Sequence, residues 1–165
     1  MKVLVTGGAG FIGRWVVERL LKDGHQVLVL DNLSNGSKEN LEEFKTNKNF
    51  IGLIVGDLED VPLLERIFSR FQFHLCFHLA AKINVQDSID NPRETFESDV
   101  IGTFNLLEQC KQFDVKMVFM STCMVYDRAE DENGINELSR VKPASVYAGA
   151  KLAAEHLVLS YYYSY

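Results

Sequence analysis

Val3-Leu4-Val5-Thr6-Gly7-Gly8-Ala9-Gly10-Phe11-Ile12-Gly13 is a short apolar run followed at once by a glycine-rich turn. The apolar residues predict a strand. The residues after the turn, 11–22, place apolar side chains at the i, i+3, i+4 spacing of a helix, and Gly24 follows as a stop signal. A strand and a helix joined by glycines at this spacing are typical of the first βα unit of a dinucleotide-binding domain.

The rest of the chain repeats this alternation of short apolar runs and amphipathic segments. Further strands are expected at 26–30, 51–55, 73–78 and 115–121. Helices are expected at 37–44, 61–71, 92–111 and from 145 into the tyrosine-rich end, and an acidic, polar surface loop at 127–139. This order predicts an α/β fold with a Rossmann-like, doubly wound parallel sheet. Because a sixth strand is still due at the end of the sequence, we expect residues 1–165 to be one dinucleotide-binding Rossmann domain, truncated before its last strands.

Composition narrows the class of protein. A chain of 165 residues has room for one domain with a real core. The net charge of -6 argues against a nucleic-acid partner, and no apolar run approaches the ~20 residues that span a membrane. Cys76, Cys110 and Cys123 are far apart and fit no metal-ligand spacing, so we expect free thiols, no metal site and a cytoplasmic location.

The glycine-rich turn predicts where a dinucleotide binds. Gly7, Gly10 and Gly13 allow a tight turn and a close approach of the pyrophosphate to the backbone. Phe11 and Ile12 begin the helix, whose N-terminus offers free N–H groups and the positive end of its dipole.

Acidic and amide residues after the second and third strands extend this site. Asp31 ends the second strand, where a carboxylate binds the ribose hydroxyls and repels a 2′-phosphate, so NAD is favoured over NADP. Asn32 and Asn35 are further polar candidates in the same loop, and Asp57 follows the third strand, where it can face the adenine. The alternative is that the glycines mark only a turn and Asp31 only a loop.

A second motif, Tyr147 and Lys151, lies in the last expected helix. Residues at i and i+4 share a helix face. A phenol is a poor base at neutral pH, and a nearby ammonium stabilises its phenolate. Ser121 and Thr122 end the fifth strand, where a parallel sheet presents its active residues, and either hydroxyl can orient a substrate. The alternative is a surface Tyr and Lys on an amphipathic helix.

These motifs together resemble the extended short-chain dehydrogenases/reductases, and within them the NAD-dependent epimerase/dehydratase family that acts on nucleotide sugars. The residues that carry the resemblance are Thr6 to Gly13, Asp31 to Asn35, Gly56-Asp57-Leu58, His78-Leu79-Ala80-Ala81, Ser121-Thr122 and Tyr147 to Lys151.

The resemblance implies a role for each matching residue. Tyr147 is the expected catalytic acid/base. Lys151 is expected to hold the nicotinamide ribose and to lower the pKa of Tyr147, and Thr122 to bind the sugar hydroxyl. Asp57 and Leu58 match the pair that contacts adenine, and Ala80 and Ala81 line the middle of the cofactor. The family also has a C-terminal lobe that holds the nucleotide of the sugar, and this lobe is absent from the chain.

Departures from the family pattern favour one reaction over another. Dehydratases of the family carry Asp-Glu after the catalytic Thr, whereas this chain has Cys123 and Met124. This argues for an epimerase of a nucleotide-diphosphate sugar that works through a transient keto intermediate. The alternatives are a dehydratase or reductase of the same family, or a dinucleotide-binding module without turnover. Asp127 and Asp99 stand where the family has Gly and Asn.

The resemblance also implies a partner. The helices that start near Pro92 and Ser145 match the pair that forms the family's dimer interface, so a homodimer is expected. Of the remaining residues, His78 is interpreted as structural, and Asn84 and Ser88 as part of a loop that faces the substrate.

Overall fold

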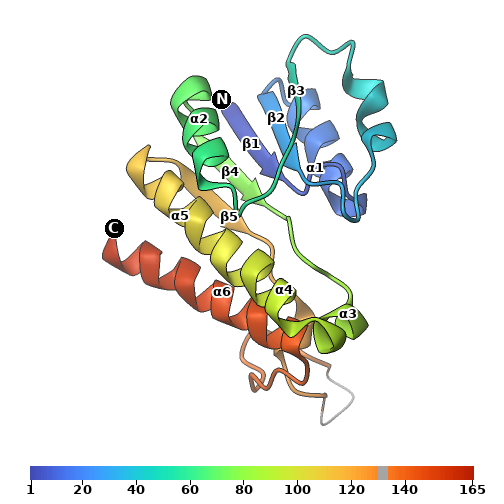
Figure 1. Cartoon of the computed structure of the whole chain (residues 1–165), viewed down its shortest axis with the longest axis vertical. Helices are drawn as coiled ribbons and strands as arrows, with labels where there is room; N and C mark the ends of the chain where they lie inside the picture. Colours follow the sequence, from blue (N-terminus) through green and yellow to red (C-terminus); the bar gives the residue numbers. More distant parts are fainter. Residues whose placement is uncertain (130–133) are drawn as a thin grey trace.

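A computed structural model of the chain describes residues 1–129 and 134–165. Five parallel strands form one sheet in the order β3-β2-β1-β4-β5 (Figure 1). The strands are β1 (Lys2–Thr6), β2 (Gln26–Asp31), β3 (Phe50–Val55), β4 (Leu75–His78) and β5 (Lys116–Phe119). The strand order reverses at β1, and in such sheets ligands bind beyond the carboxyl ends of the strands at that point.

The helices lie on both faces of the sheet. They are α1 (Phe11–Lys22), η1 (Lys38–Phe44), α2 (Val61–Phe71), α3 (Val85–Asp90), α4 (Pro92–Phe96), η2 (Glu97–Ile101), α5 (Gly102–Gln112), η3 (Cys123–Val125) and α6 (Val146–Ser164), where η1 and η3 are 3₁₀ helices and η2 is a π-helical turn. Figure 1 shows α6 running beside α4 and α5 on the side of the sheet that α2 also covers.

Alternation along β1 and β2 builds two cores, one on each face of the sheet. Val3, Val5, Val27 and Val29 point toward α1 and η1, where they pack with buried residues such as Val17. The intervening Leu4, Leu28 and Leu30 point the other way, toward Leu64, Ile67 and Phe68 of α2 and Leu106 of α5. Because both faces of the sheet are covered, nearly every side chain of β1 and β2 is buried, which is why short continuous apolar runs predicted these strands.

The helix expected at 92–111 is interrupted, which is a correction to the sequence interpretation. It consists of α4, the π turn η2 and α5, and the π turn buries Asp99 and Val100. A π turn inserts a residue into a helix without changing its composition, so hydrophobic periodicity gives no sign of it.

The segment expected as a loop around Ser88 contains a short helix, α3. The Asn84 side chain caps it by accepting hydrogen bonds from the N–H groups of Gln86 at 2.9 Å and Asp87 at 3.3 Å. A six-residue helix without an apolar stripe is below what periodicity detects.

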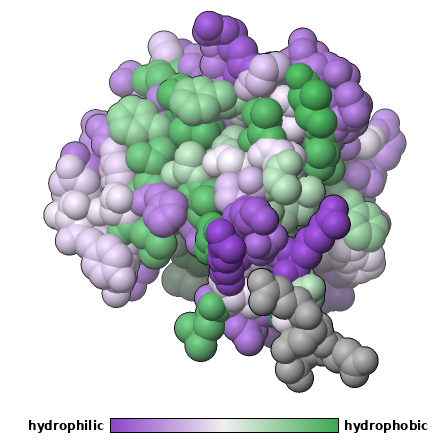
Figure 2. Space-filling view, turned by 90° about the horizontal axis from the view of Figure 1, so that it is seen from below, coloured by the Kyte–Doolittle hydropathy of each residue, from purple (hydrophilic) through white to green (hydrophobic). Residues whose placement is uncertain are grey.

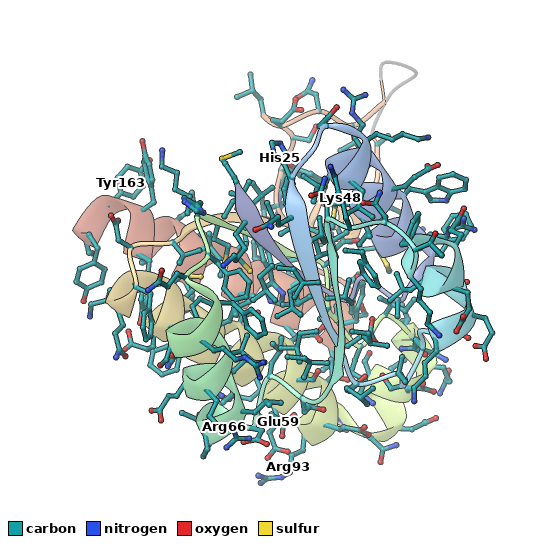
Figure 3. All side chains as sticks on the ribbon, turned by 90° about the horizontal axis from the view of Figure 1, so that it is seen from above. His25, Lys48, Glu59, Arg66, Arg93 and Tyr163 are labelled. Atoms are coloured by element: carbon teal, nitrogen blue, oxygen red, sulfur yellow. The ribbon has the colours of Figure 1, made fainter. Side chains whose placement is uncertain are left out.

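The loop expected at 127–139 falls partly outside the described residues, since 130–133 are not described. The described flanks are joined, because Tyr126 and Val141 form an antiparallel bridge and the Asp127 N–H donates to the Arg140 carbonyl at 2.8 Å. At the end of α6, Tyr163 is exposed and projects from the body of the molecule (Figure 3). Within residues 1–129 and 134–165 no helix has the length and apolar character needed to cross a membrane.

Candidate active site

A cavity of about 450 Å³ lies where the five strands end. Figure 2 looks at the molecule from this side, and hydrophobic residues cover much of the face. Every residue that the sequence marked for catalysis or cofactor binding lines this one cavity: Gly7, Gly10, Phe11, Ile12, Gly13, Asp31, Asn32, Asn35, Asp57, Leu58, Ala80, Ala81, Thr122, Tyr147 and Lys151. Its volume is that of a small-molecule or cofactor site.

The glycine-rich turn is shaped by contacts that leave no room for a side chain. Gly7 has a φ of +69°, and a Cβ there would lie 2.6 Å from the Ala80 backbone nitrogen. A Cβ on Gly13 would lie 2.1 Å from the Gly7 carbonyl oxygen. The turn and the first turn of α1 therefore form a cradle that only glycine can build, which is the shape that a pyrophosphate needs.

The N-terminus of α1 completes this cradle. Its first N–H groups have no acceptor within the helix, and within the described part of the chain no side chain caps it at Gly10. Phe11, Ile12 and Gly13 thus present N–H donors to the cavity with the positive end of the helix dipole. The arrangement fits a dinucleotide phosphate.

Asp31 connects the end of β2 to the glycine-rich turn. It is only 7% exposed, and its Oδ2 accepts the Ala9 N–H at 2.9 Å while its Oδ1 accepts the Leu33 N–H at 2.9 Å. Beside it, the Asn32 side-chain amide donates to Asp57 Oδ2 at 2.8 Å. Two carboxylates and an amide therefore occupy the rim at the ends of β2 and β3, the position expected for the adenosine end of the cofactor.

Tyr147 and Lys151 enter the cavity from the first turns of α6. Ser145 caps this helix by accepting the Ala148 N–H at 3.1 Å, and the Tyr147 N–H donates to the Ser88 hydroxyl at 3.2 Å. Both side chains are buried, and the Lys151 ammonium lies 4.2 Å from the centre of the Phe119 ring. Ser88, expected to face the substrate, instead holds the backbone at the start of α6.

The pKa of Tyr147 differs from the expectation. We expected Lys151 to lower it, but in the structure burial raises the pKa of Tyr147 above its ordinary value, and the hydrogen bond with Thr122 opposes this shift. The charges of Asp99 and Cys123 raise the pKa of Tyr147 further. Burial also lowers the pKa of Lys151 to about 8. Sequence spacing put the two groups on one helix face but could not reveal how deeply the phenol is buried.

Of the two hydroxyls after β5, Thr122 is the one available to a substrate. The Ser121 hydroxyl donates to Glu155 Oε2 at 2.6 Å, which ties it to α6. Thr122 Oγ1 accepts the Met124 N–H at 3.3 Å, so its own proton remains free for Tyr147 or a ligand. This supports the choice of Thr122 over Ser121.

His78 belongs to a buried chain of hydrogen bonds and is structural, as interpreted. The Thr103 hydroxyl donates to the Asp99 carbonyl at 2.6 Å, so toward His78 it must accept from Nε2–H, at 2.9 Å. Nδ1 is then the acceptor for the Thr6 hydroxyl at 2.7 Å. The imidazole is thereby fixed in its neutral form, and burial lowers the pKa of His78 to about 3.

The cavity also contains residues that the sequence interpretation missed. Lys82 and Ile83 follow β4, Ser98 lies in the π turn, and Met120 follows β5. Lys82, Ile83 and Met120 could have been found because each lies just beyond the carboxyl end of a parallel strand, where such sheets hold ligands. Ser98 had no such signal.

Comparison with known proteins agrees with this geometry. A family profile described as GDP-mannose 4,6 dehydratase matches residues 4–165. The crystal structure of Pal from Bacillus thuringiensis is 63% identical with a TM-score of 0.98, covering 100% of this chain and 53% of that one. Thermus thermophilus UDP-glucose 4-epimerase, solved in complex with NAD, is 40% identical with a TM-score of 0.91, covering 100% of this chain and 52% of that one.

Among curated proteins, the UDP-glucose 4-epimerase of Halalkalibacterium halodurans is 38% identical over 158 residues, which cover 95% of this chain and 45% of that protein. The chain thus spans about half the length of the curated relatives it matches. The family profile, the parallel sheet and the glycine cradle at its switch point agree. Two similar solved structures, the UDP-glucose 4-epimerases of Thermus thermophilus and Brucella ovis, contain NAD. The chain belongs to the NAD-dependent epimerase/dehydratase family of extended short-chain dehydrogenases/reductases.

Proposed function

We propose that this protein is an NAD-dependent epimerase of a nucleotide-diphosphate sugar, an isomerase that works through a transient keto intermediate. One observation carries the proposal: Thr122, Tyr147 and Lys151 line the same cavity as the glycine cradle and Asp31. Acid–base groups and a dinucleotide cradle in one space support chemistry in which a base takes the proton of a substrate hydroxyl while the cofactor takes the hydride from the carbon that bears that hydroxyl.

Each side chain has a distinct proposed task. Thr122 orients the sugar hydroxyl, and the Tyr147 phenol exchanges a proton with that hydroxyl oxygen. The Lys151 ammonium, buried beside them, holds the nicotinamide ribose. NAD, when bound, supplies the hydride acceptor. Because the keto group is reduced again on the other face, the reaction is redox-neutral and calls for tight retention of the cofactor.

Cys123 and Met124 favour epimerisation over dehydration. Both follow Thr122 in η3, and neither a thiol nor a thioether matches the acid and base that remove water in the dehydratases that the family pattern describes. The dehydratase alternative remains a candidate because the matching family profile carries that description. A dinucleotide-binding module without turnover is the other alternative, because the chain spans about half of its relatives.

The substrate class and the assembly are part of the same proposal. Similar proteins are named for UDP-glucose, which makes a nucleoside-diphosphate hexose the first substrate to test. A homodimer is proposed through α4, α5 and α6, which carry exposed hydrophobic residues such as Phe96, Phe104 and Leu159. The cytoplasm is the proposed compartment, since Cys76, Cys110 and Cys123 are free thiols.

The decisive experiment compares the Tyr147→Phe variant with the wild-type protein, each incubated with UDP-glucose and with UDP-N-acetylglucosamine. We expect wild type to produce an epimer of unchanged mass and Tyr147→Phe to lose about 10²–10⁴-fold in turnover while still binding NAD. Tyr162→Phe, at an exposed tyrosine of the same helix, is the matched control and should keep wild-type turnover.

Each other outcome has a definite meaning. Turnover that survives Tyr147→Phe would contradict the mechanism. A product lighter by one water would identify the dehydratase, and bound NAD without conversion of either sugar would favour the binding module.

A further inference from the structure

Asp99 is a buried acidic group that has no role in the reaction proposed above. It lies in the π turn η2 and is only 2% exposed. Its Oδ1 accepts the Lys82 N–H at 2.7 Å, whereas its Oδ2 is buried without a hydrogen-bond partner among residues 1–129 and 134–165. A buried carboxylate oxygen without a partner is destabilising unless a nearby opposite charge compensates for it.

A second buried group, Lys151, carries the opposite charge. Its side chain comes from α6, which packs on η2, and it is 3% exposed. Burial lowers the pKa of Lys151 to about 8, and the charge of Asp99 is the first influence that opposes this. Burial raises the pKa of Asp99 to about 6, opposed by the Lys82 N–H and then by the charge of Lys151.

The other titratable groups that act on Asp99 or Lys151, or lie in the same hydrogen-bond chain, come from β4, the loop after it and α6. From β4, His78 is neutral in its hydrogen-bond chain. From the loop after β4, the Lys82 ammonium is paired with Glu94 at 2.6 Å. From α6, the pKa of the Tyr147 phenol is raised by the charge of Asp99. Glu155, also on α6, raises the pKa of Lys151 less than Asp99 does. Lys151 is therefore the buried cation that balances the negative charge of Asp99.

The backbone at Asp99 is held in place from the opposite side. Its carbonyl accepts the Thr103 hydroxyl, which in turn accepts from His78, and His78 accepts from Thr6 of β1. This chain joins the π turn to the centre of the sheet. Rigid support of this kind is what a group needs when its charge must act over a fixed distance.

We propose that Asp99 is a positioning residue of this active site: its buried carboxylate is the counter-charge that keeps Lys151 an ammonium and restrains the ionisation of Tyr147. The inference rests on the proposed function for the acid–base role of Tyr147. Asp99 thus keeps Lys151 protonated as an ammonium and Tyr147 protonated as a phenol. The negative charge of Asp99 makes loss of the Tyr147 proton less favourable.

Asp99→Asn tests this electrostatic role while nearly preserving shape. The amide oxygen can still accept the Lys82 N–H, but the negative charge is gone. Because the charge of Asp99 raises the pKa of both Lys151 and Tyr147, both values should fall in the variant. We expect about a tenfold increase in each ionisation constant.

The direction of the two shifts separates this role from a structural one. If Asp99→Asn merely loosened the site, water would enter and relieve burial, which raises the pKa of a lysine but lowers the pKa of a tyrosine. Loss of a counter-charge moves both downward. The test therefore measures Lys151 by NMR of ¹³C-labelled lysine and Tyr147 by phenolate absorbance, with Tyr147→Phe as the subtracted background.

Glu94→Gln is the matched control, since it also replaces a carboxylate by an amide but at an exposed position. It should leave both ionisations as in wild type. Unchanged values in Asp99→Asn, or shifts of Lys151 and Tyr147 in opposite directions, would overturn the proposal.

A second measurement keeps the proposal testable if Asp99→Asn does not fold. In wild type, the lysine signal of Lys151 should show an inflection near pH 6, where Asp99 gains its proton. A Lys151 signal without that inflection would overturn the proposal. Neither readout needs turnover, so its failure would leave the epimerase proposal untouched.

Discussion

At the scale of single residues, two glycines in helices give opposite predictions for the same substitution. Gly13→Ala places a Cβ 2.1 Å from the Gly7 carbonyl oxygen, and the clash is with backbone, which cannot rotate away. Gly149→Ala, in α6, meets nothing within 4 Å. We expect Gly13→Ala to destabilise the fold by about 3 kcal/mol, the upper end for overpacking, and to weaken NAD binding.

Gly149→Ala should instead stabilise by about 1 kcal/mol, because alanine is the better helix former. Urea unfolding and NAD titration of both variants check the pair. If Gly13→Ala bound NAD like wild type, the close packing of the glycine cradle would not matter for the cofactor.

Among single residues of the site, some could be predicted from the sequence and others could not. Asp31 was predictable because an acid at the end of the second strand has one geometric place in this fold. Its two backbone hydrogen bonds, to Ala9 and Leu33, were not predictable because they depend on how the turn folds back. Ser98 was missed because it reaches the cavity only through the π turn, which has no signature in the sequence.

At the scale of elements, α5 and α6 offer a test of the proposed dimer. Leu159 on α6 is 42% exposed, and Leu138, in a loop remote in sequence from these helices, is 96% exposed. Leu159→Glu would bury an unpaired carboxylate in the proposed interface, whereas Leu138→Glu would stay in water. We expect light scattering to report a dimer for wild type and Leu138→Glu, and a monomer for Leu159→Glu.

A wild-type monomer, or a Leu159→Glu dimer, would contradict that interface. Most strands and helices were predictable, because strands that are buried on both faces are continuous apolar runs and because α1 and α2 follow a period of 3.6. What periodicity could not reveal were α3, which depends on the Asn84 cap, and the π turn within the helix expected at 92–111.

At the scale of the whole molecule, the buried chain from Thr6 through His78 to Thr103 links β1, β4 and α5, and it makes stability depend on pH. The pKa of His78 is about 3 in the folded protein, against 6.5 as its ordinary value. Below pH 6.5 the unfolded chain gains a proton that the folded one refuses, so this group costs stability as pH falls, by about 1.4 kcal/mol per pH unit until about pH 3.

Asp99 acts in the opposite sense, and the experiment must separate the two groups. Its folded pKa of about 6 lies above the ordinary value of 3.8, so between these values the folded protein binds the proton first and gains stability as pH falls.

Urea unfolding of wild type and His78→Gln from pH 7 to 4 isolates the contribution of the histidine, because Asp99 is present in both proteins. Gln offers one donor and one acceptor but does not titrate. We expect wild type to be the more stable at pH 7 and to lose about 1.4 kcal/mol of that advantage per unit below pH 6.5. A difference that stays constant over this range would mean that folding does not hold His78 neutral, and the hydrogen-bond chain would have to be reassigned.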